Sequence, residues 1–151
     1  MNLPIEKDTI LKRINGIQRE LVSLRKFAAM PLPEFSQDVN FTSSQLHLQR
    51  VLQGVLNIAS HILSRIPGGQ ATTYKEMALK LGEFGIVDKS FAKEKLEKMA
   101  GYRNRLVHFY DEITAEQIYD ILHNHLVDVE EFLKYAKEVL EHPEKFNLTV
   151  E

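Results

Sequence analysis

Four side chains with complementary chemistry lie within residues 99–110: Arg103, Asn104, His108 and Tyr110. An arginine guanidinium offers a planar fork of donors to a phosphate and stabilises negative charge as it develops. A histidine titrates near neutrality, so it can take a proton from a ribose 2′-hydroxyl or return one to a leaving oxygen. Asn104 can orient the imidazole or contact the phosphate, and Tyr110 adds a hydroxyl donor or a stacking face. These residue types together fit the cleavage of a phosphodiester without a metal ion.

The helical period around these residues separates the guanidinium from the imidazole. Arg103 shares an apolar stripe with Met99 and Leu106, so it points toward the packed side and needs a partner there, or an opening to water or an anion. At ~100° per residue, Arg103 and His108 lie roughly 140° apart on one ideal helix. They can converge if the helix end loosens near Phe109, or if a second copy of the chain faces the first. On spacing alone, the ordinary interpretation is a helix end where Arg103 pairs with a carboxylate and His108 lies near the C-terminal dipole.

The rest of the chain shows the 3.6-residue period of amphipathic helices and almost no alternation with a period of two. Prolines, glycines and capping-box pairs divide this pattern into segments; the pairs are Thr42/Gln45, Thr73/Glu76 and Thr114/Gln117. The expected helices cover roughly residues 5–29, 42–66, 73–84, 88–106 (from Asp88 or Ser90) and 114–136, with Pro143 as the outer limit of the last. Residues 31–41 are expected to form a connection. The predicted fold is all-α, an antiparallel up-and-down bundle of four long helices and one short helix, with one domain over residues 1–142 and a loose tail over 143–151.

Composition limits the classes of protein and of site. The chain has 151 residues, a formal net charge of −2, 44% apolar residues and no cysteine. These values describe one globular domain and exclude intrinsic disorder, a disulfide framework, a thiolate nucleophile and a cysteine zinc site. No apolar run is long enough to cross a membrane and the first residues lack a secretory signal, so we expect a cytoplasmic protein. The near-neutral charge argues against a general nucleic-acid coat protein, so any nucleic-acid chemistry must be confined to a small site.

The stretch around Arg103 resembles the signature of the HepT-like family, formerly the DUF86 family, within the HEPN superfamily of helical domains. The family motif is Arg-x4-His-x-Tyr, and Arg103, His108 and Tyr110 occupy its three fixed positions. Asn104 matches the polar residue that the family favours after the arginine. The resemblance is specific over about residues 70–113, where it includes the segments 73–76 and 85–87, and it agrees in helix pattern over the remainder.

This resemblance implies a homodimer whose motifs face each other across a cleft, which would bring Arg103 and His108 of two chains into one site. It implies a metal-independent endoribonuclease, the toxin of a toxin–antitoxin pair, with Arg103 and His108 as catalytic residues and Asn104, Tyr102 and Tyr110 as supporting ones. The usual partner is a minimal nucleotidyltransferase encoded beside the toxin. It can silence the toxin by attaching AMP units to the motif tyrosine, here Tyr110. RNA is then the substrate, and neither a cofactor nor a metal ion is expected.

Further groups of residues are candidates for binding. Lys98 and Arg105 add positive charge to the motif helix. They either form a patch that steers RNA toward the motif, or they belong to a solvated helix face on which neighbouring glutamates balance their charge. His123 and His125 lie two positions apart, ~200° around a helix, so they cannot chelate one ion. His47 and His61 are expected to be surface residues or core residues with satisfied polar groups. Asp128, Glu130 and Glu131 could be paired carboxylates, but they are expected to be solvent residues on the last helix.

Two functions from other classes stay open. The chain could be a helical module that binds a nucleotide or a nucleotidyltransferase, is modified on Tyr110 and cleaves nothing, which the charge of −2 favours slightly. It could also be a purely structural dimerising bundle, which would leave Arg103 and His108 without a role. A test of RNA cleavage distinguishes the non-cleaving binding module from a ribonuclease. Replacement of both residues by glutamine without any effect would indicate the second.

Overall fold

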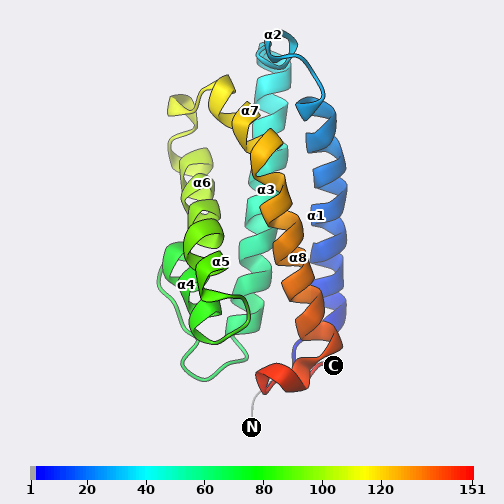
Figure 1. Cartoon of the computed structure of the whole chain (residues 1–151), viewed down its shortest axis with the longest axis vertical. Coiled ribbons are helices and arrows are strands. Elements are labelled where there is room, and N and C mark those ends of the chain that lie inside the picture. Colours follow the sequence, from blue (N-terminus) through cyan, green and yellow to red (C-terminus); the bar gives the residue numbers. More distant parts are fainter. Residues whose placement is uncertain (1–2) are drawn as a thin grey trace.

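The computed structural model describes residues 3–151 and is built from helices (Figure 1). These are α1 (Lys7–Ala28), α2 (Leu32–Phe35), α3 (Asp38–Leu63), α4 (Tyr74–Glu83), α5 (Lys89–Phe91), η1 (Ala92–Leu96), α6 (Glu97–His108), η2 (Tyr110–Glu112), α7 (Ala115–Asn124), α8 (Leu126–Glu141) and η3 (Pro143–Phe146). The long helices run side by side along one axis in alternating directions, which confirms the predicted all-α bundle. Within the described residues, no helix has the length and apolar content needed to span a membrane.

The antiparallel pair of α1 and α3 forms the centre of the core. The helical spacing of apolar residues in the first helix predicts a stripe from Ile10 to Ala28. Five of its members are at most 2% exposed, and Ala28 is partly buried; the five are Ile10, Ile14, Ile17, Leu21 and Leu24. Helix α3 has a broader apolar face, because it packs against α1 on one side and against α4 and α6 on another. Gly54 permits the close approach of α1, since a Cβ there would lie 2.7 Å from Ile17 Cγ1, well inside the distance at which carbon atoms pack.

The beginning of α3 differs from the sequence prediction. Residues 31–41 do not form a simple connection, because α2 forms there and α3 begins at Asp38 rather than at Thr42. Phe35 in α2 is fully buried, and its ring centre lies 5.1 Å from that of Tyr119 on α7. Burial of this aromatic side chain fixes the segment against the bundle. The predicted capping-box spacing therefore lies inside a helix, where it caps nothing.

Two other predicted caps are observed. Thr114 and Gln117 form a complete capping box at the start of α7, with hydrogen bonds of 3.2 and 3.0 Å. At the start of α4, Thr73 accepts a hydrogen bond from the Glu76 N–H (3.1 Å), but the Glu76 carboxylate turns to Thr72 instead of completing the box. Hydrogen bonds from the N–H and the hydroxyl of Thr72 hold the pKa of Glu76 below its ordinary value.

The last long helix of the prediction is in fact two helices. The backbone leaves helical geometry at His125 (φ −123°, ψ −5°), and α8 begins at Leu126. Asp128 is only 8% exposed, so the expectation that it is a solvent residue is wrong. The Nδ1 of His125 lies 3.3 Å from Asp128 Oδ2, so the break provides a partner for this buried carboxylate. The apolar spacing continues across the break, from Ile121 to Leu126, so the period of the sequence gives no sign of it.

The C-terminal segment is packed, which corrects the prediction of a loose tail over residues 143–151. After η3, Leu148 is 6% exposed and joins the core, and Val150 forms a parallel bridge with Ile5. The N–H and the carbonyl of Ile5 both make backbone hydrogen bonds to this segment, of 2.7 and 2.9 Å. Apolar side chains at alternate positions, 148 and 150, thus fix the end of the chain against its beginning.

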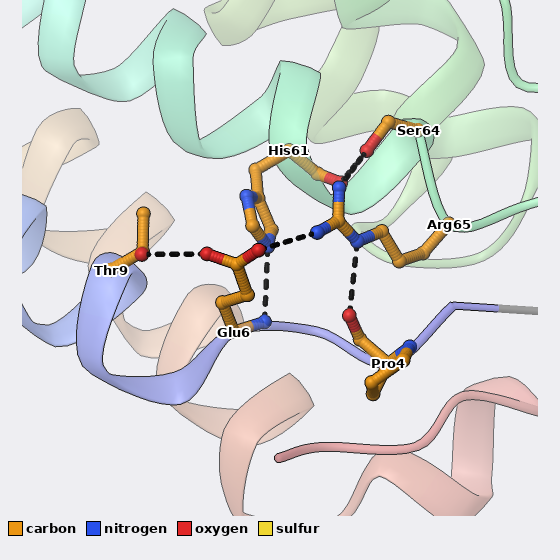
Figure 2. A network of polar contacts seen from close by, with 6 residues as sticks. All are labelled: Pro4, Glu6, Thr9, His61, Ser64 and Arg65. Carbon is orange, nitrogen blue, oxygen red and sulfur yellow. Dashed lines mark hydrogen bonds and ion pairs between the residues drawn. The ribbon is translucent and has the colours of Figure 1, made fainter.

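A polar network ties the beginning of the chain to the end of α3 (Figure 2). Arg65 Nε donates a hydrogen bond to the Pro4 carbonyl (3.0 Å), and Arg65 Nη2 lies 3.2 Å from Glu6 Oε1. The backbone N–H of Glu6 donates to His61 Nε2 (3.1 Å), so this ring nitrogen carries no proton. Burial, reinforced by the positive charge of Arg65, lowers the pKa of His61 below its ordinary value.

The motif lies on one continuous helical segment made of α5, η1 and α6. Asp88 precedes it as the N-cap residue, in agreement with the prediction, whereas the π-helical turn η1 has no sequence signal. Helix α4 packs closely against this segment because a Cβ at Gly82 would lie only 2.8 Å from Ala92 Cβ. Gly85 (φ 74°) adopts the left-handed conformation that ends α4. These features place α6 beside α3 and α4. The C-terminal end of α6 is directed toward the end of the bundle at which α2 lies (Figure 1).

Candidate functional site

Arg103 is held in place by side chains from three helices. Arg103 lies on α6. Its Nε donates a hydrogen bond to Gln53 Oε1 on α3 (2.9 Å), and its Nη1 donates to Asn104 Oδ1 (3.3 Å). Its guanidinium carbon lies 4.6 Å from the centre of the Tyr74 ring on α4, a cation–π contact. Gln53 Nε2 in turn donates to Asn57 Oδ1 (2.9 Å), which fixes the orientation of the Gln53 amide. The guanidinium is therefore pre-oriented by contacts that occupy only part of its donor edge.

The remaining part of this edge can bind an anion. A guanidinium carries five N–H donors, and Nη2 of Arg103 makes no hydrogen bond within residues 3–151. No carboxylate in that range pairs with it, so the ordinary interpretation of Arg103 as half of an ion pair does not describe the arrangement there. The side chain is half-buried, so an anion at this position would interact more strongly than at a fully exposed arginine.

His108 and Tyr110 lie at the exposed end of the motif helix. His108 is the last residue of α6 and is exposed, and its ring centre is 6.4 Å from that of Phe109. Tyr110 begins the short helix η2 and is 62% exposed. Neither side chain hydrogen-bonds to another group in the described part of the chain. Both polar groups are therefore open to a substrate or to a modifying enzyme.

The structure keeps Arg103 and His108 on different sides of α6. The segment stays helical through His108 and leaves helical geometry only at Phe109 (φ −135°, ψ 34°). The five-residue spacing therefore keeps its angle of roughly 140°. The helix end does loosen near Phe109, but the change comes after His108 and does not bring the two groups together. Of the two routes to convergence, the one that is left is a second copy of the chain.

The supporting residues Asn104 and Tyr102 have different surroundings. Asn104 accepts the hydrogen bond from Arg103, so its side chain is directed to the guanidinium rather than to His108 one turn away. Tyr102 is half-buried and its ring lies 6.4 Å from that of His125, at the packing between α6 and the α7–α8 break. Asn104 is thus part of the arginine's immediate environment, whereas Tyr102 contacts the core behind it.

A groove runs along α6 beside the motif. It encloses about 570 Å³, and both residues predicted to steer RNA, Lys98 and Arg105, line it. Tyr102, Asn104 and Phe109 contribute to the same walls. The groove therefore connects the predicted steering residues with the immediate neighbours of Arg103 and His108.

The histidines of α7 each have a local partner. His123 Nδ1 lies 2.8 Å from the Tyr119 carbonyl, whereas His125 contacts Asp128. Among the residues that the structure describes, the one group of three potential metal ligands within mutual reach is exposed and contains no predicted site residue; it consists of Glu138, Glu141 and His142. The groups that surround the Arg103 guanidinium are the amides of Gln53 and Asn104 and the ring of Tyr74.

Gln53 and Asn57 are contributors to the site that sequence reasoning missed. They lie about fifty positions before Arg103 in the chain and carry no motif. Tyr74 lies in the predicted short helix, but the sequence gives no sign of its contact with Arg103. Gln53 and Tyr74 contact the arginine directly, and Asn57 acts through Gln53. These contacts depend on how α3 and α4 face α6, and the spacing of one helix does not contain this information.

Comparison with known proteins gives a family and several relatives. A family model described as Ribonuclease HepT-like matches residues 17–136, a range that includes every residue of the arginine site. A protein of Aphanizomenon flos-aquae (strain 2012/KM1/D3) named tRNA nuclease HepT is 34% identical over 117 residues, which are 76% of this chain and 78% of that protein. A protein of Shewanella oneidensis named mRNA nuclease HepT is 27% identical over 131 residues, 86% of this chain and 97% of that protein.

A solved structure shares the arrangement of helices. It is described as a tri-AMPylated Shewanella oneidensis HEPN toxin in complex with MNT antitoxin. Its TM-score is 0.77 at 27% sequence identity, and the match covers 86% of this chain and 97% of that chain. This similarity confirms that the bundle is HEPN-like.

Proposed function

The chain belongs to the HepT-like ribonuclease family of the HEPN superfamily, and from this premise we propose that it is a metal-independent endoribonuclease toxin that acts in the cytoplasm as a homodimer. One observation carries the proposal. A single helix presents a guanidinium that is anchored but has a free donor edge, Arg103, and an imidazole that is open to solvent, His108. The nuclease names of both relatives support the same class of activity.

In the proposed reaction, His108 takes the proton from a ribose 2′-hydroxyl, and the freed oxygen attacks the adjacent phosphorus. The bond to the 5′-oxygen of the next nucleotide breaks, and that oxygen receives the proton that His108 carries, which returns the histidine to its neutral form. The products are a 2′,3′-cyclic phosphate and a 5′-hydroxyl. Arg103 donates to the non-bridging phosphate oxygens and stabilises the charge that develops on them, while Asn104 and Gln53 hold its guanidinium. These protein groups supply the proton transfer and the charge stabilisation that the reaction needs.

Direct cleavage of RNA in the presence of EDTA tests this reaction. We expect a 2′,3′-cyclic phosphate at the new end, and we expect Arg103→Ala and His108→Ala to fold normally and to lose cleavage. RNA left intact by the unmodified protein, across several substrates, would contradict the proposal. It would favour the second candidate, a non-cleaving module that binds a nucleotidyltransferase and is modified on Tyr110. That candidate draws support from the exposure of Tyr110, 62%.

The positions of the two proposed catalytic groups support a homodimer. Because α6 stays helical between Arg103 and His108, one complete site takes the arginine from one chain and the histidine from the other. Co-expression of Arg103→Ala with His108→Ala tests this arrangement, since a mixed dimer contains one intact site and one doubly defective site. Random pairing should then restore roughly a quarter of wild-type activity. A mixture as inactive as either variant alone would show that the site is not shared.

Tyr110 is proposed as the site at which a cognate nucleotidyltransferase antitoxin attaches AMP. Its hydroxyl would attack the α-phosphate of a nucleoside triphosphate and release pyrophosphate. The position at the exposed end of α6, two residues from His108, makes the hydroxyl accessible and makes a bulky, charged adduct an obstacle to RNA. The relative solved as a tri-AMPylated toxin with MNT antitoxin supports this role. Intact-mass measurement after co-expression should show AMP increments that Tyr110→Phe abolishes.

A further inference from the structure

Basic residues gather in the groove along α6 without acidic partners. Those that line it are Lys75 from α4, Lys93 from η1, and Lys98 and Arg105 from α6. Glu97 is the one acidic residue of this lining. None of the four basic side chains forms an ion pair with any residue between 3 and 151, although several basic residues elsewhere on the surface do. Unpaired positive charge in one concave surface attracts an anionic polymer.

The groove is elongated and leads to the catalytic groups. Lys93 and Phe109 mark its two ends, and a helix of that length extends about 24 Å, enough for several nucleotides. Near one end lie Asn104, which binds the Arg103 guanidinium, and Phe109, which follows His108 in the chain. A strand placed along the groove therefore arrives at the proposed site of cleavage.

An aromatic side chain distinguishes an unpaired strand from a duplex. Phe109 lines the groove, and its side chain is 52% exposed. Such a ring can stack on an unpaired base, whereas the bases of a duplex are stacked on one another and hidden from it. We propose that this groove binds an unpaired RNA strand, with its basic side chains at the phosphates and Phe109 stacked on a base next to the scissile bond. The inference rests on the proposed function and specifies its substrate as single-stranded RNA.

The salt dependence of RNA binding tests the phosphate contacts. The measurements use the full-length His108→Ala protein, so that a short fluorescent single-stranded RNA stays intact during titration. Each phosphate contact to a single strand contributes about 0.7 to the slope of log K against log salt, so Lys75→Gln with Lys93→Gln should reduce the slope by roughly 1.4. The matched control replaces two exposed lysines of α8, Lys134 and Lys137, by glutamine, with the same change in charge. A slope equal to that of the control would overturn the proposal.

A second variant tests the stacking contact. Phe109→Leu in the same His108→Ala background should weaken single-strand binding roughly 5- to 150-fold, the range for loss of one base–aromatic stack. Binding of the same RNA annealed to its complement should be weaker at the outset and insensitive to this change. Equal affinity for both forms, or an equal effect of Phe109→Leu on both, would overturn the assignment to an unpaired strand.

These binding results are separable from the proposed function. If the wild-type protein cleaves RNA but the lysine variants bind like the control, the groove assignment is wrong and the nuclease stands. If no RNA is cleaved but the slope falls as expected, the groove binds RNA in a protein that is not a nuclease. If RNA binding is unchanged and binding of the purified antitoxin falls instead, the groove is a protein-docking surface and the proposal is wrong.

Discussion

Replacement of Gln53 by methionine tests whether catalysis requires Arg103 to be held by α3. Methionine keeps the length of the side chain but gives Arg103 Nε no good acceptor. The hydrogen bond that is lost is 2.9 Å long and has a charged donor, a class worth about 1.5–3 kcal/mol. Because Arg103 is only half-buried and keeps its contact with Tyr74, we expect the lower part of that range. A loss of about 1.5–2 kcal/mol from the transition state is a roughly 10- to 30-fold slower reaction.

Single-turnover cleavage of RNA across a range of enzyme concentrations measures this effect. Charge on the phosphate oxygens increases in the transition state, so a loosened guanidinium should lower the maximal rate more than it weakens substrate binding. Gln49→Met, one turn earlier on α3, makes the same chemical change without a contact to Arg103 and serves as the control. Thermal unfolding of both variants shows whether the bundle is intact, because about 1 kcal/mol moves the Tm by roughly 2–4 °C at this size. Wild-type rates for Gln53→Met would refute the reasoning.

Three further predictions concern stability. The folded-state pKa of His61 lies below its ordinary value, so the unfolded chain takes up a proton first as pH falls below about 6.5. The free energy of unfolding, measured with urea, should therefore decrease toward acid pH. The decrease should be smaller in His61→Gln, which has no imidazole to protonate at this position. Gly54→Ala should lower the free energy of unfolding by roughly 1–3 kcal/mol, because the new Cβ meets Ile17 Cγ1 at 2.7 Å, and an unchanged denaturation midpoint would contradict this. Leu148→Ala should cost about 2 kcal/mol in the same assay, whereas a neutral effect would mean that the C-terminal segment adds nothing to the core.

The features that sequence predicted correctly are those determined by neighbouring residues. The stripe from Ile10 to Leu24 is a helix face because its spacing is helical, and the structure buries all of it. The Thr114/Gln117 capping box needs only the two residues that form it. The motif of Arg103, His108 and Tyr110 can be identified from the sequence because it depends on residue identity and spacing along one short segment, and the roles of these residues stay predictions.

The features that sequence missed are determined by contacts between distant segments. Helix α2 is stabilised where Phe35 meets Tyr119, a residue more than eighty positions away. The break at His125 leaves the apolar period undisturbed, so hydrophobic spacing describes one helix where the structure has two. Gln53 looks like an ordinary polar residue on a helix, and only its location opposite Arg103 gives it a role. In each case the missing information is the orientation of one helix against another.

The two proposed catalytic residues have opposite structural requirements, and these requirements can be met at two positions of one helix. Arg103 needs neighbours that hold its guanidinium, so it lies where α6 packs against α3 and α4. His108 needs access to solvent and substrate, so it lies at the free end of the same helix. If two chains share each site as proposed, the reaction depends on how the exposed ends of α6 meet across the dimer. An adduct on Tyr110 would then block the reaction by charge and volume at that junction, without any change in the bundle that holds Arg103.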